Sequence, residues 1–459
     1  MDIETGKSNC IELFGGIMNT LNLRTLMENN KEINYPIWHP FSGSTKNFFN
    51  QLVLNRGKGI YVYDNNGKEY IDACSGLWNV SLGYSNEKIT DYIIKQLGLI
   101  SYCSLFEHTN SMVVFAANKI LGLLPDCFSK IQFTCSGSES IDLAIKVMRE
   151  YWKLRGKISK NLIICFKKSY HGTYYGSMSV SGITRDETDR YAPFLENIVL
   201  QEVPDESMEQ EEYEIYSVRL EKYIEENHQN IAGIIVEPIL ASAGVEIMPI
   251  EYLNRIYKCC KKFDVLITLD EVALGFYRTG KSFYFYNTDI IPDILCMAKG
   301  INSGYLPLGA VAFHKNIVDI YTKSNVILAH GSTQGGNVLA CAATVGAIEE
   351  YERLNISENV IKEGKYLKSQ LTEKLKYHKN ISEIRGIGLL ISIDLTDNKK
   401  QIPVSQIKLD YIQKLLAREG LLLYRSLTGL TLLPMLNITR AEIDKLLNIL
   451  EKFFRNYMF

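Results

Sequence analysis

The chain has 459 residues, of which 46% are hydrophobic and 22% are charged, and its formal net charge is -2. This is ordinary globular composition, and without a basic stripe that has interleaved aromatics nothing in the sequence suggests a nucleic-acid partner. No apolar run reaches membrane-span length, and the ten cysteines form no CxxC pair or Cys/His cluster, so we expect no membrane insertion and no metal site.

The N-terminal region is hard to interpret, and we treat residues 1–35 as an extension. It is acidic and has no apolar signal stretch, and the scattered thiols are typical of a reducing compartment, so we expect a cytoplasmic protein. From residue 59 the pattern sharpens. IYVYD and KEYIDA flank Asn-Asn-Gly at 65–67, which predicts a hairpin turn.

The middle of the chain alternates short apolar runs with helical stretches. The apolar runs are IQFT (131–134), NLIICF (161–166), IAGIIVEP (231–238), VLITLD (265–270), DILCMA (293–298) and GAVAFH (309–314). Helical patterns occupy 139–154 and the segment EYLNRIYKCCKKF. Strands that alternate with helices predict an α/β fold, with a mostly parallel sheet covered on both faces.

A long helix, VLACAATVGAIEEYER, follows this block, and a smaller α+β unit comes after it. That unit has a helix near 357–377, strands at LLISIDL and LLLYRS, and a terminal helix in RAEIDKLLNILEKFFRNYM. We therefore predict a large domain and a smaller domain made from both chain ends. The predicted boundaries are 1–35 for the extension, 36–83 for the first part of the small domain, 84–336 for the large domain, and 337–459 for the linking helix and the rest of the small domain.

Polar groups follow four of the predicted strands. They are Ser136-Gly137-Ser138 after IQFT, Glu237 near the end of IAGIIVEP, Asp270 at the end of VLITLD, and Lys299 after DILCMA. In open α/β sheets, sites form at the carboxyl ends of the strands, so we expect these groups to meet at one rim.

Each of these groups alone has an ordinary explanation: a helix cap, an ion pair or a solvated loop lysine. Together they match the needs of pyridoxal phosphate. A helix N-terminus binds its phosphate, a carboxylate pairs with its pyridinium nitrogen, and an amine reacts with its aldehyde.

The sequence also resembles the class III pyridoxal-phosphate aminotransferases, which have the fold-type I architecture. The similar segments are FTCSGSESIDLAIKVMREYW, YHGTYYGSMS, VEPI, LITLDEVALGFYRTG, PDILCMAKGINSGYLPLGAV and HGSTQGGNVLACAA. The resemblance runs in a consistent order from about Trp38 to the C-terminus. It implies an aminotransferase whose large domain binds pyridoxal phosphate.

The resemblance implies two catalytic residues. Lys299 would carry the cofactor and later move the substrate's Cα proton, and Asp270 would hold the proton on the pyridine nitrogen. The other implied cofactor contacts are Tyr170 and Val272 on the two ring faces, His171 beside Tyr170, Gly137 and Ser138 on the phosphate, Glu237 supporting Asp270, and Thr333 on the phosphate in the partner subunit. The role of Thr333 implies a homodimer with shared active sites.

The segment SGLWNV is similar to the ω-amino-acid and amine:pyruvate transaminases within the class. The similarity implies that Trp78 lines the substrate pocket. It also implies that Arg425 is a mobile arginine, which pairs with a substrate carboxylate and swings away for apolar amines. A core tryptophan and a surface arginine are the ordinary alternatives. Ser242 departs from the family pattern at a position that could reshape the pocket. We expect a ping-pong reaction in which an ω-amino acid or primary amine donates its amino group to a keto acid such as pyruvate.

Other functions are compatible with part of this pattern. The segment IWHPFS also resembles the 7,8-diaminopelargonate aminotransferases, and an aminomutase or decarboxylase of the class would share the cofactor residues. A binding or regulatory protein without catalysis is an alternative of a different kind. The presence of Ser138, Asp270, Lys299 and Thr333 argues against it, because such a protein would be free to lose the lysine.

Overall fold

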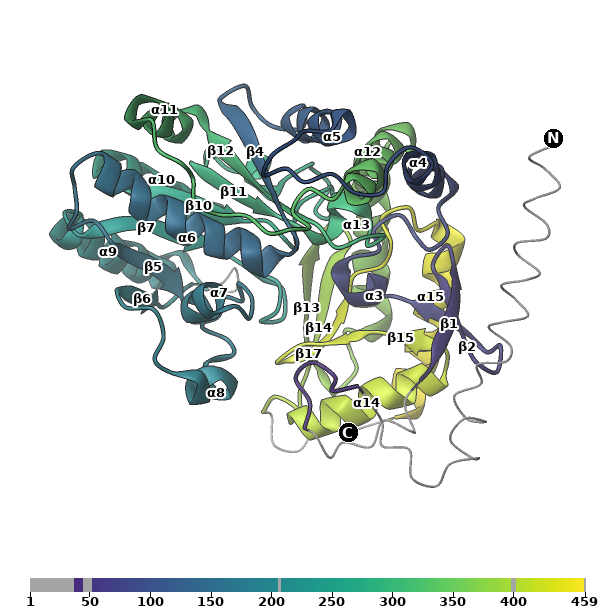
Figure 1. Ribbon diagram of the computed structural model, residues 1–459. Coiled ribbons are helices and arrows are strands. Elements are labelled where there is room, and N and C mark those ends of the chain that lie inside the picture. Colours follow the sequence, from purple (N-terminus) through teal and green to yellow (C-terminus); the bar gives the residue numbers. More distant parts are fainter. Residues whose placement is uncertain (1–36, 44–51, 205–207, 398–401, 458–459) are drawn as a thin grey trace, which may run out of the picture. The chain divides into compact units, whose positions relative to one another are not determined.

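The computed structural model describes residues 37–43, 52–204, 208–397 and 402–457 (Figure 1). The predicted N-terminal extension therefore lies outside the described residues. The chain divides into one unit of residues 1–57 and 62–69, and another of residues 58–61 and 70–459. The first unit contains most of β1 (Leu54–Lys58) and β2 (Tyr61–Asp64). Its turn at 65–67 is stabilised by Asp64, whose Oδ1 accepts the N–H groups of Asn66 and Lys68 at 2.8 and 2.9 Å.

A seven-stranded sheet forms the centre of the second unit (Figure 1), in the order β4-β12-β11-β10-β7-β5-β6. Its strands are β4 (Phe128–Thr134), β5 (Leu162–Phe166), β6 (Ile198–Gln201), β7 (Ile231–Val236), β10 (Leu266–Asp270), β11 (Ile294–Met297) and β12 (Gly309–His314). Only β12 runs antiparallel to its neighbours in this sheet. The mostly parallel sheet predicted from the sequence is confirmed. Strand β6, at one edge, was not predicted.

Both faces of this sheet are buried. Along β11, Ile294 and Cys296 belong to one apolar cluster, and Leu295 and Met297 belong to the other. Helices α6 (Gly137–Leu154) and α11 (Lys315–Ser324) contribute to the first cluster, and α5 (Ser111–Leu121), α10 (Ile250–Lys262) and α12 (Val338–Arg353) contribute to the second. Burial on both faces explains why these strands have continuous apolar runs instead of alternating sequences.

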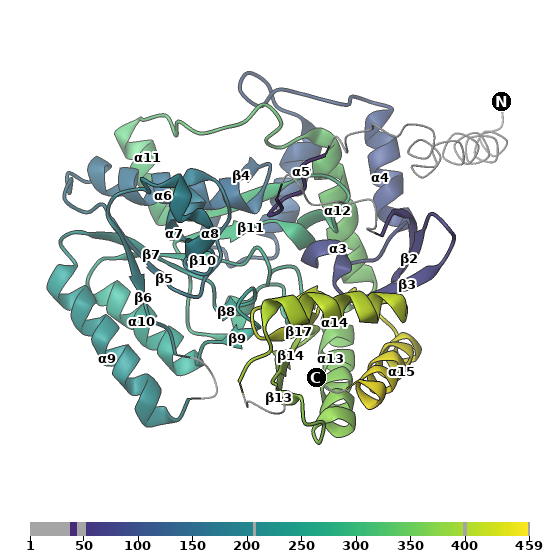
Figure 2. The same cartoon turned by 90° about the horizontal axis from the view of Figure 1, so that it is seen from below.

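Further helices lie around this sheet and around the remaining, smaller part of the second unit, which contains the antiparallel strands described below (Figure 2). They are α3 (Ser75–Trp78), α4 (Glu87–Leu97), α7 (Tyr175–Val180), α8 (Arg185–Thr188), α9 (Gln210–Asn227), α13 (Ile356–Leu375), α14 (Gln406–Arg418), α15 (Arg440–Asn456), and the 3₁₀ helices η2 (Asp189–Tyr191), η3 (Tyr284–Asn287) and η4 (Lys299–Asn302). Helix α15 begins with a capping box, in which the Glu442 carboxylate accepts the Thr439 N–H at 2.8 Å. Among the described helices, none combines the length and apolar character needed to cross a bilayer.

The smaller part combines segments from both ends of the chain. Strand β15 (Leu421–Leu422) pairs in parallel with β3 (Glu69–Asp72). A second sheet of this part is antiparallel and has the strand order β13-β14-β17-β16. Its strands are β13 (Ile381–Ile387), β14 (Leu390–Leu395), β17 (Gly429–Leu432) and β16 (Tyr424–Arg425), and a short ribbon consists of β8 (Ile239–Leu240) and β9 (Glu246–Ile247). The predicted α/β architecture with a smaller α+β part is confirmed, and the exact domain boundaries stay predictions.

Candidate active site

The carboxyl ends of three neighbouring strands bring two acids and an amine to one rim. Asp270 is the last residue of β10, Glu237 follows β7, and Lys299 follows β11 after one residue. Strand β10 lies between the other two, with Asp270 opposite Cys296 and Leu269 opposite Val236. Because these strands are parallel, the residues that follow them emerge at the same edge of the sheet.

Lys299 lies in a strained and desolvated position. Its φ of 43° is in the left-handed region, which costs a non-glycine residue about 1–3 kcal/mol. The Nζ atom lies 4.5 Å from the centre of the Trp78 ring. Burial lowers the pKa of Lys299, and the charges of Asp270 and Glu237 oppose this shift. A lowered pKa increases the fraction of Lys299 that is present as the neutral, nucleophilic amine.

Asp270 is only 4% exposed and both of its carboxylate oxygens have partners. Its Oδ2 lies 2.7 Å from His171 Nδ1, and its Oδ1 accepts the Val272 N–H at 3.0 Å. These two interactions fix the orientation of the carboxylate. In the described part of the chain, His171 Nε2 is buried without a hydrogen-bond partner. An unpaired buried nitrogen costs about 1–3 kcal/mol, so this atom indicates that a ligand or water binds beside the His171 ring.

Glu237 connects two loops at the rim. Its carboxylate accepts the N–H of Tyr170 at 3.3 Å and the N–H of Ala241 at 3.2 Å. Burial, followed by the charge of Asp270, raises the pKa of Glu237 to about 8. This shift disfavours a second negative charge beside Asp270.

The first turn of α6 forms a cradle near this rim. The helix begins at Gly137, after Ser136, whose Oγ accepts an N–H of the first turn at 3.2 Å. A Cβ atom on Gly137 would lie 2.9 Å from Val272 Cγ1, and one on Gly172 would lie 2.2 Å from Ser138 Oγ. The two glycines therefore allow these segments to approach more closely than a larger residue would permit. The N–H groups of a first turn lack partners within the helix, and the helix dipole favours an anion there.

The chemistry of these residues fits the cofactor expected from the sequence. Lys299 offers an amine, Asp270 offers an oriented carboxylate, and the start of α6 at Gly137 offers a binding site for phosphate. A group bound beside His171 would also give its unpaired Nε2 a partner. The residues that could hold pyridoxal phosphate are thus present at one rim, and their individual roles stay predictions.

A turn organised by Asp72 positions Trp78. The carboxylate of Asp72 accepts the N–H groups of Cys74 and Gly76 at 3.0 and 2.7 Å, and the Tyr84 O–H at 2.7 Å. Trp78 has a left-handed φ of 64° and is 5% exposed. Its Nε1 is buried without a partner in the described part of the chain. The turn therefore holds the indole ring against the amine of Lys299.

Arg425 is paired with an acidic side chain in the structure, and its role toward a substrate stays a prediction. Its Nε forms an ion pair with Asp410 Oδ1 of α14 at 2.7 Å. The neighbouring residue, Tyr424, contacts the Trp78 ring instead, with 4.9 Å between ring centres and 75° between the planes. Tyr424 was not predicted as a site residue. The sequence did contain a signal for it, because side chains alternate between the two faces of a strand and Tyr424 and Arg425 therefore point to opposite faces.

Two other predicted residues lie outside the network of contacts at the rim. Ser242 lies in the turn between β8 and β9, directly after Ala241. Thr333 lies on an exposed loop, where its carbonyl oxygen accepts the Tyr102 O–H at 2.9 Å. The described contacts of Thr333 include none with Asp270 or Lys299. The roles expected for Ser242 and Thr333 therefore stay predictions.

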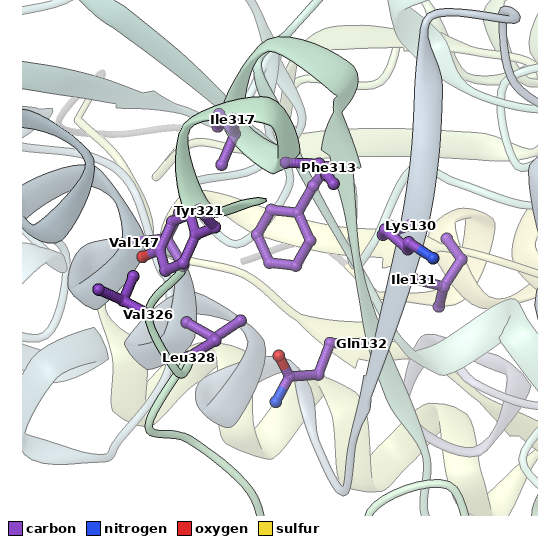
Figure 3. Close-up of a pocket in the computed structure, with 10 residues that line it drawn as sticks. Lys130, Ile131, Gln132, Val147, Phe313, Ile317, Tyr321, Val326 and Leu328 are labelled. Atoms are coloured by element: carbon purple, nitrogen blue, oxygen red, sulfur yellow. The ribbon is translucent and has the colours of Figure 1, made fainter. Parts of the chain in front are cut away.

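A separate pocket lies at the β4 edge of the large sheet (Figure 3). Its lining is mostly apolar: Ile131, Val147, Phe313, Ile317, Val318, Tyr321, Val326 and Leu328, with Lys130 and Gln132. None of these residues is a predicted site residue, and the pocket brings no acid together with an amine. We therefore locate the chemistry at the rim of Asp270 and Lys299.

Comparisons with known proteins cover nearly the whole chain. The family model described as aminotransferase class-III matches residues 42–454. An adenosylmethionine-8-amino-7-oxononanoate aminotransferase of Staphylococcus aureus is 31% identical over 92% of this chain and 96% of its own. A vanillin aminotransferase of Capsicum frutescens is 32% identical over 92% of this chain and 95% of its own. The PLP-bound amine transaminase from an uncultivated Pseudomonas species is a similar solved structure. It has a TM-score of 0.85 and 29% identity, and the match covers 92% of this chain and 98% of the other.

Proposed function

The chain belongs to the class III aminotransferases and uses pyridoxal phosphate, and from this premise we propose that it transfers an amino group from an ω-amino acid or primary amine to a keto acid such as pyruvate. The observation that carries the proposal is the position of Trp78, whose ring lies 4.5 Å from Lys299 Nζ and contacts Tyr424. Aromatic side chains beside the amine suit a donor with an apolar substituent. The similarity to an amine transaminase supports the same donor class.

The residues at the rim can be assigned different roles in the reaction. When bound, pyridoxal phosphate supplies an aldehyde for the donor amine and a ring that accepts electrons from the substrate's Cα. We assign Lys299 Nζ to hold the cofactor at rest and, once the donor has displaced it, to take the proton from Cα. Asp270 would keep the ring nitrogen protonated, and Gly137 and Ser138 would bind the phosphate. The burial of Trp78 would exclude water while the proton moves.

A donor panel tests this proposal. The enzyme is supplied with pyruvate and with primary amines, β-amino acids or γ-amino acids in turn, and alanine is measured. We expect alanine from at least one donor, because the keto acid receives the amino group in the second half of a ping-pong cycle. If no donor gives alanine in a preparation that contains cofactor, the proposed substrates are wrong.

A second candidate function has a specific observation in its favour. The Staphylococcus aureus relative is named for adenosylmethionine and 8-amino-7-oxononanoate, and it matches this chain over 440 residues. This function would use the same cofactor residues, so only the substrates distinguish it. Incubation with these two compounds, followed by mass spectrometry, would show an aminated product if the second function is the real one.

We also propose that the protein forms a homodimer with shared active sites. Exposed apolar residues gather in two contacting segments: Phe106 is 70% exposed and lies beside Gly331, and Ile327 is 84% exposed. Apolar surface of this kind is typical of an interface between subunits. Sedimentation velocity should give a mass near twice 52.3 kDa, and a monomer that remains active would contradict the dimer.

We further propose that the protein is cytoplasmic, and cell fractionation would test this location.

A further inference from the structure

The backbone around Lys299 needs support from its neighbours. Lys299 begins η4 and Ser303 follows its last residue, and both have left-handed φ values, of 43° and 57°. This conformation is unfavourable for a residue with a Cβ atom and persists only where the surrounding structure holds it. At the far end of η4, Ser303 Oγ accepts the Leu82 N–H at 2.8 Å. The near end determines where the Lys299 amine emerges, and it needs a contact of its own.

Tyr351 of α12 supplies that contact. Its phenol donates a hydrogen bond to the carbonyl oxygen of Gly300 at 2.7 Å. On another side, a Cβ atom on Gly300 would lie 3.2 Å from Phe276 Cβ and 3.2 Å from Ser81 Oγ. Gly300 is therefore closely packed at its Cα and hydrogen-bonded at its carbonyl. Its peptide plane cannot turn without losing one of these contacts, and Lys299 is the residue directly before it.

The phenol of Tyr351 is itself held in place. Tyr351 is 1% exposed, and its ring centre lies 6.4 Å from that of Phe276 and 5.6 Å from that of Tyr277. Burial raises the pKa of Tyr351, while a hydrogen bond with Ser81 and the charge of Arg278 oppose the shift. The phenol therefore keeps its proton at neutral pH and remains a hydrogen-bond donor.

We propose that Tyr351 is a positioning residue for Lys299, because its buried phenol holds the Gly300 carbonyl and so keeps the Lys299 amine at the rim, over the Trp78 ring. The inference rests on the proposed function only for the role of Lys299 in the reaction. Tyr351 acts through the backbone and needs no contact with a substrate or with the cofactor. Without the phenol, the Gly300 carbonyl can turn, and the Lys299 amine can move toward water.

Tyr351→Phe tests the inference, because it removes one oxygen and keeps the ring. Tyr252→Phe is the matched control. Tyr252 of α10 is fully buried in the same apolar cluster as Tyr351, but in the described part of the chain its phenol oxygen has no hydrogen-bond partner. In the holoenzyme, Tyr351→Phe should lower kcat by about 2- to 10-fold, which corresponds to one hydrogen bond, and should leave the donor KM within about twofold. Tyr252→Phe should leave both constants unchanged, and an equal loss of kcat in the two variants would overturn the inference.

The reactivity of the Lys299 amine is a readout that a loss of stability alone would not move. The full-length protein is freed of cofactor and acylated with acetic anhydride over a range of pH, and the Lys299 peptide is quantified by mass spectrometry. Burial lowers the pKa of Lys299, Asp270 and Glu237 raise it, and Arg278 lowers it, and all three charged residues stay in place in the variant. In Tyr351→Phe the amine gains water, so the midpoint of acylation should rise by about 0.5–1 pH unit, toward that of an ordinary lysine.

Lys160 serves as an internal reference in the same digest. It is 3% exposed, and burial lowers its pKa to about 8, so its acylation also reports on solvation. The midpoint of Lys160 should stay the same in wild type, Tyr351→Phe and Tyr252→Phe. An unchanged Lys299 midpoint in Tyr351→Phe would overturn the inference. A shift of Lys299 and Lys160 together would also overturn it, because it would indicate general loosening of the fold.

Hydrogen exchange tests the inference in the wild-type holoenzyme, even if Tyr351→Phe does not fold. The Ile301 N–H donates to the Ala298 carbonyl at 3.0 Å, and the Ser303 N–H donates to the Gly300 carbonyl at 3.4 Å. These amides should be protected in wild type and exchange about 2- to 10-fold faster in Tyr351→Phe. Exchange of the wild-type amides at the rate of an unfolded peptide would overturn the inference, because Gly300 would then not be held.

The acylation experiment needs no substrate, so it separates this inference from the proposed function. If no donor gives alanine but the Lys299 midpoint rises in Tyr351→Phe alone, the proposed substrates are wrong and the role of Tyr351 stands. If a donor gives alanine but the midpoint does not move, the proposed function stands and the role of Tyr351 is wrong.

Discussion

Replacing Lys299 by alanine should lower kcat by about 10³-fold or more, because the variant loses both the amine that holds the cofactor and the base that moves the Cα proton. The measurement is the rate of alanine formation from the best donor at saturating substrate. The effect should be chemical and not structural. The midpoint of thermal unfolding is measured beside the rate, because Lys299→Ala also removes the positive neighbour of the buried Asp270 carboxylate, and only a folded variant shows that the lost rate is chemical.

The control for this prediction is Lys281→Ala, which removes an exposed lysine from the loop after Gly280. That variant should keep kcat within about twofold of wild type, as surface substitutions usually do. If Lys299→Ala retained more than about a tenth of the wild-type rate, Lys299 would contribute less than general acid–base catalysis ordinarily supplies, and its assignment would have to be abandoned.

Asp270→Asn should lower kcat/KM by about 10²- to 10³-fold, the usual effect of removing one preorganised electrostatic group from an active site. Asparagine keeps the shape of the side chain and removes its charge. The charge of Asp270 raises the pKa of Lys299 and also that of Glu237, so its removal should lower both pKa values. The pH dependence of acylation of Lys299 in the cofactor-free protein, followed by peptide mass spectrometry, should therefore shift to lower pH.

Asp293→Asn is a matched control. Asp293 is also a buried aspartate, but it lies just before β11, at the amino-terminal end of the strand and away from Lys299. It accepts the Ile267 N–H at 2.8 Å and forms an ion pair with Lys261 at 3.2 Å. The control should lose stability, by about 1–3 kcal/mol, and keep kcat within about threefold. If the two variants lost activity equally, Asp270 would be acting through the fold and not through the cofactor.

Much of the large sheet could be predicted from sequence because its central strands are buried on both faces. The runs that become β7, β10 and β11 are mostly apolar, and the predicted ends differ from the observed ends by at most two residues. Strand β6 was missed because it has four residues at the edge of the sheet, where each is only partly buried. Its short, half-buried sequence lacks the pattern that identifies a central strand.

The strand-end residues of the candidate site could be predicted for a related reason. Once parallel strands are assigned, the residues that follow them must emerge at one edge, and Asp270, Glu237 and Lys299 follow from that rule. The substrate side could not be derived in this way. The ion pair of Arg425 with Asp410 joins β16 to α14, and the contact of Tyr424 with Trp78 joins residues far apart in the chain. Only a three-dimensional structure brings these pairs together.

The central claim is that the amine of Lys299 carries the cofactor, and reductive trapping tests it most directly. The enzyme loaded with pyridoxal phosphate is treated with borohydride, digested and analysed by mass spectrometry, with and without prior incubation with an amine donor. We expect the reduced cofactor on the peptide that contains Lys299, and much less of it after incubation with the donor. Cofactor attached to a different lysine, or no attachment in protein that binds the cofactor, would contradict the claim.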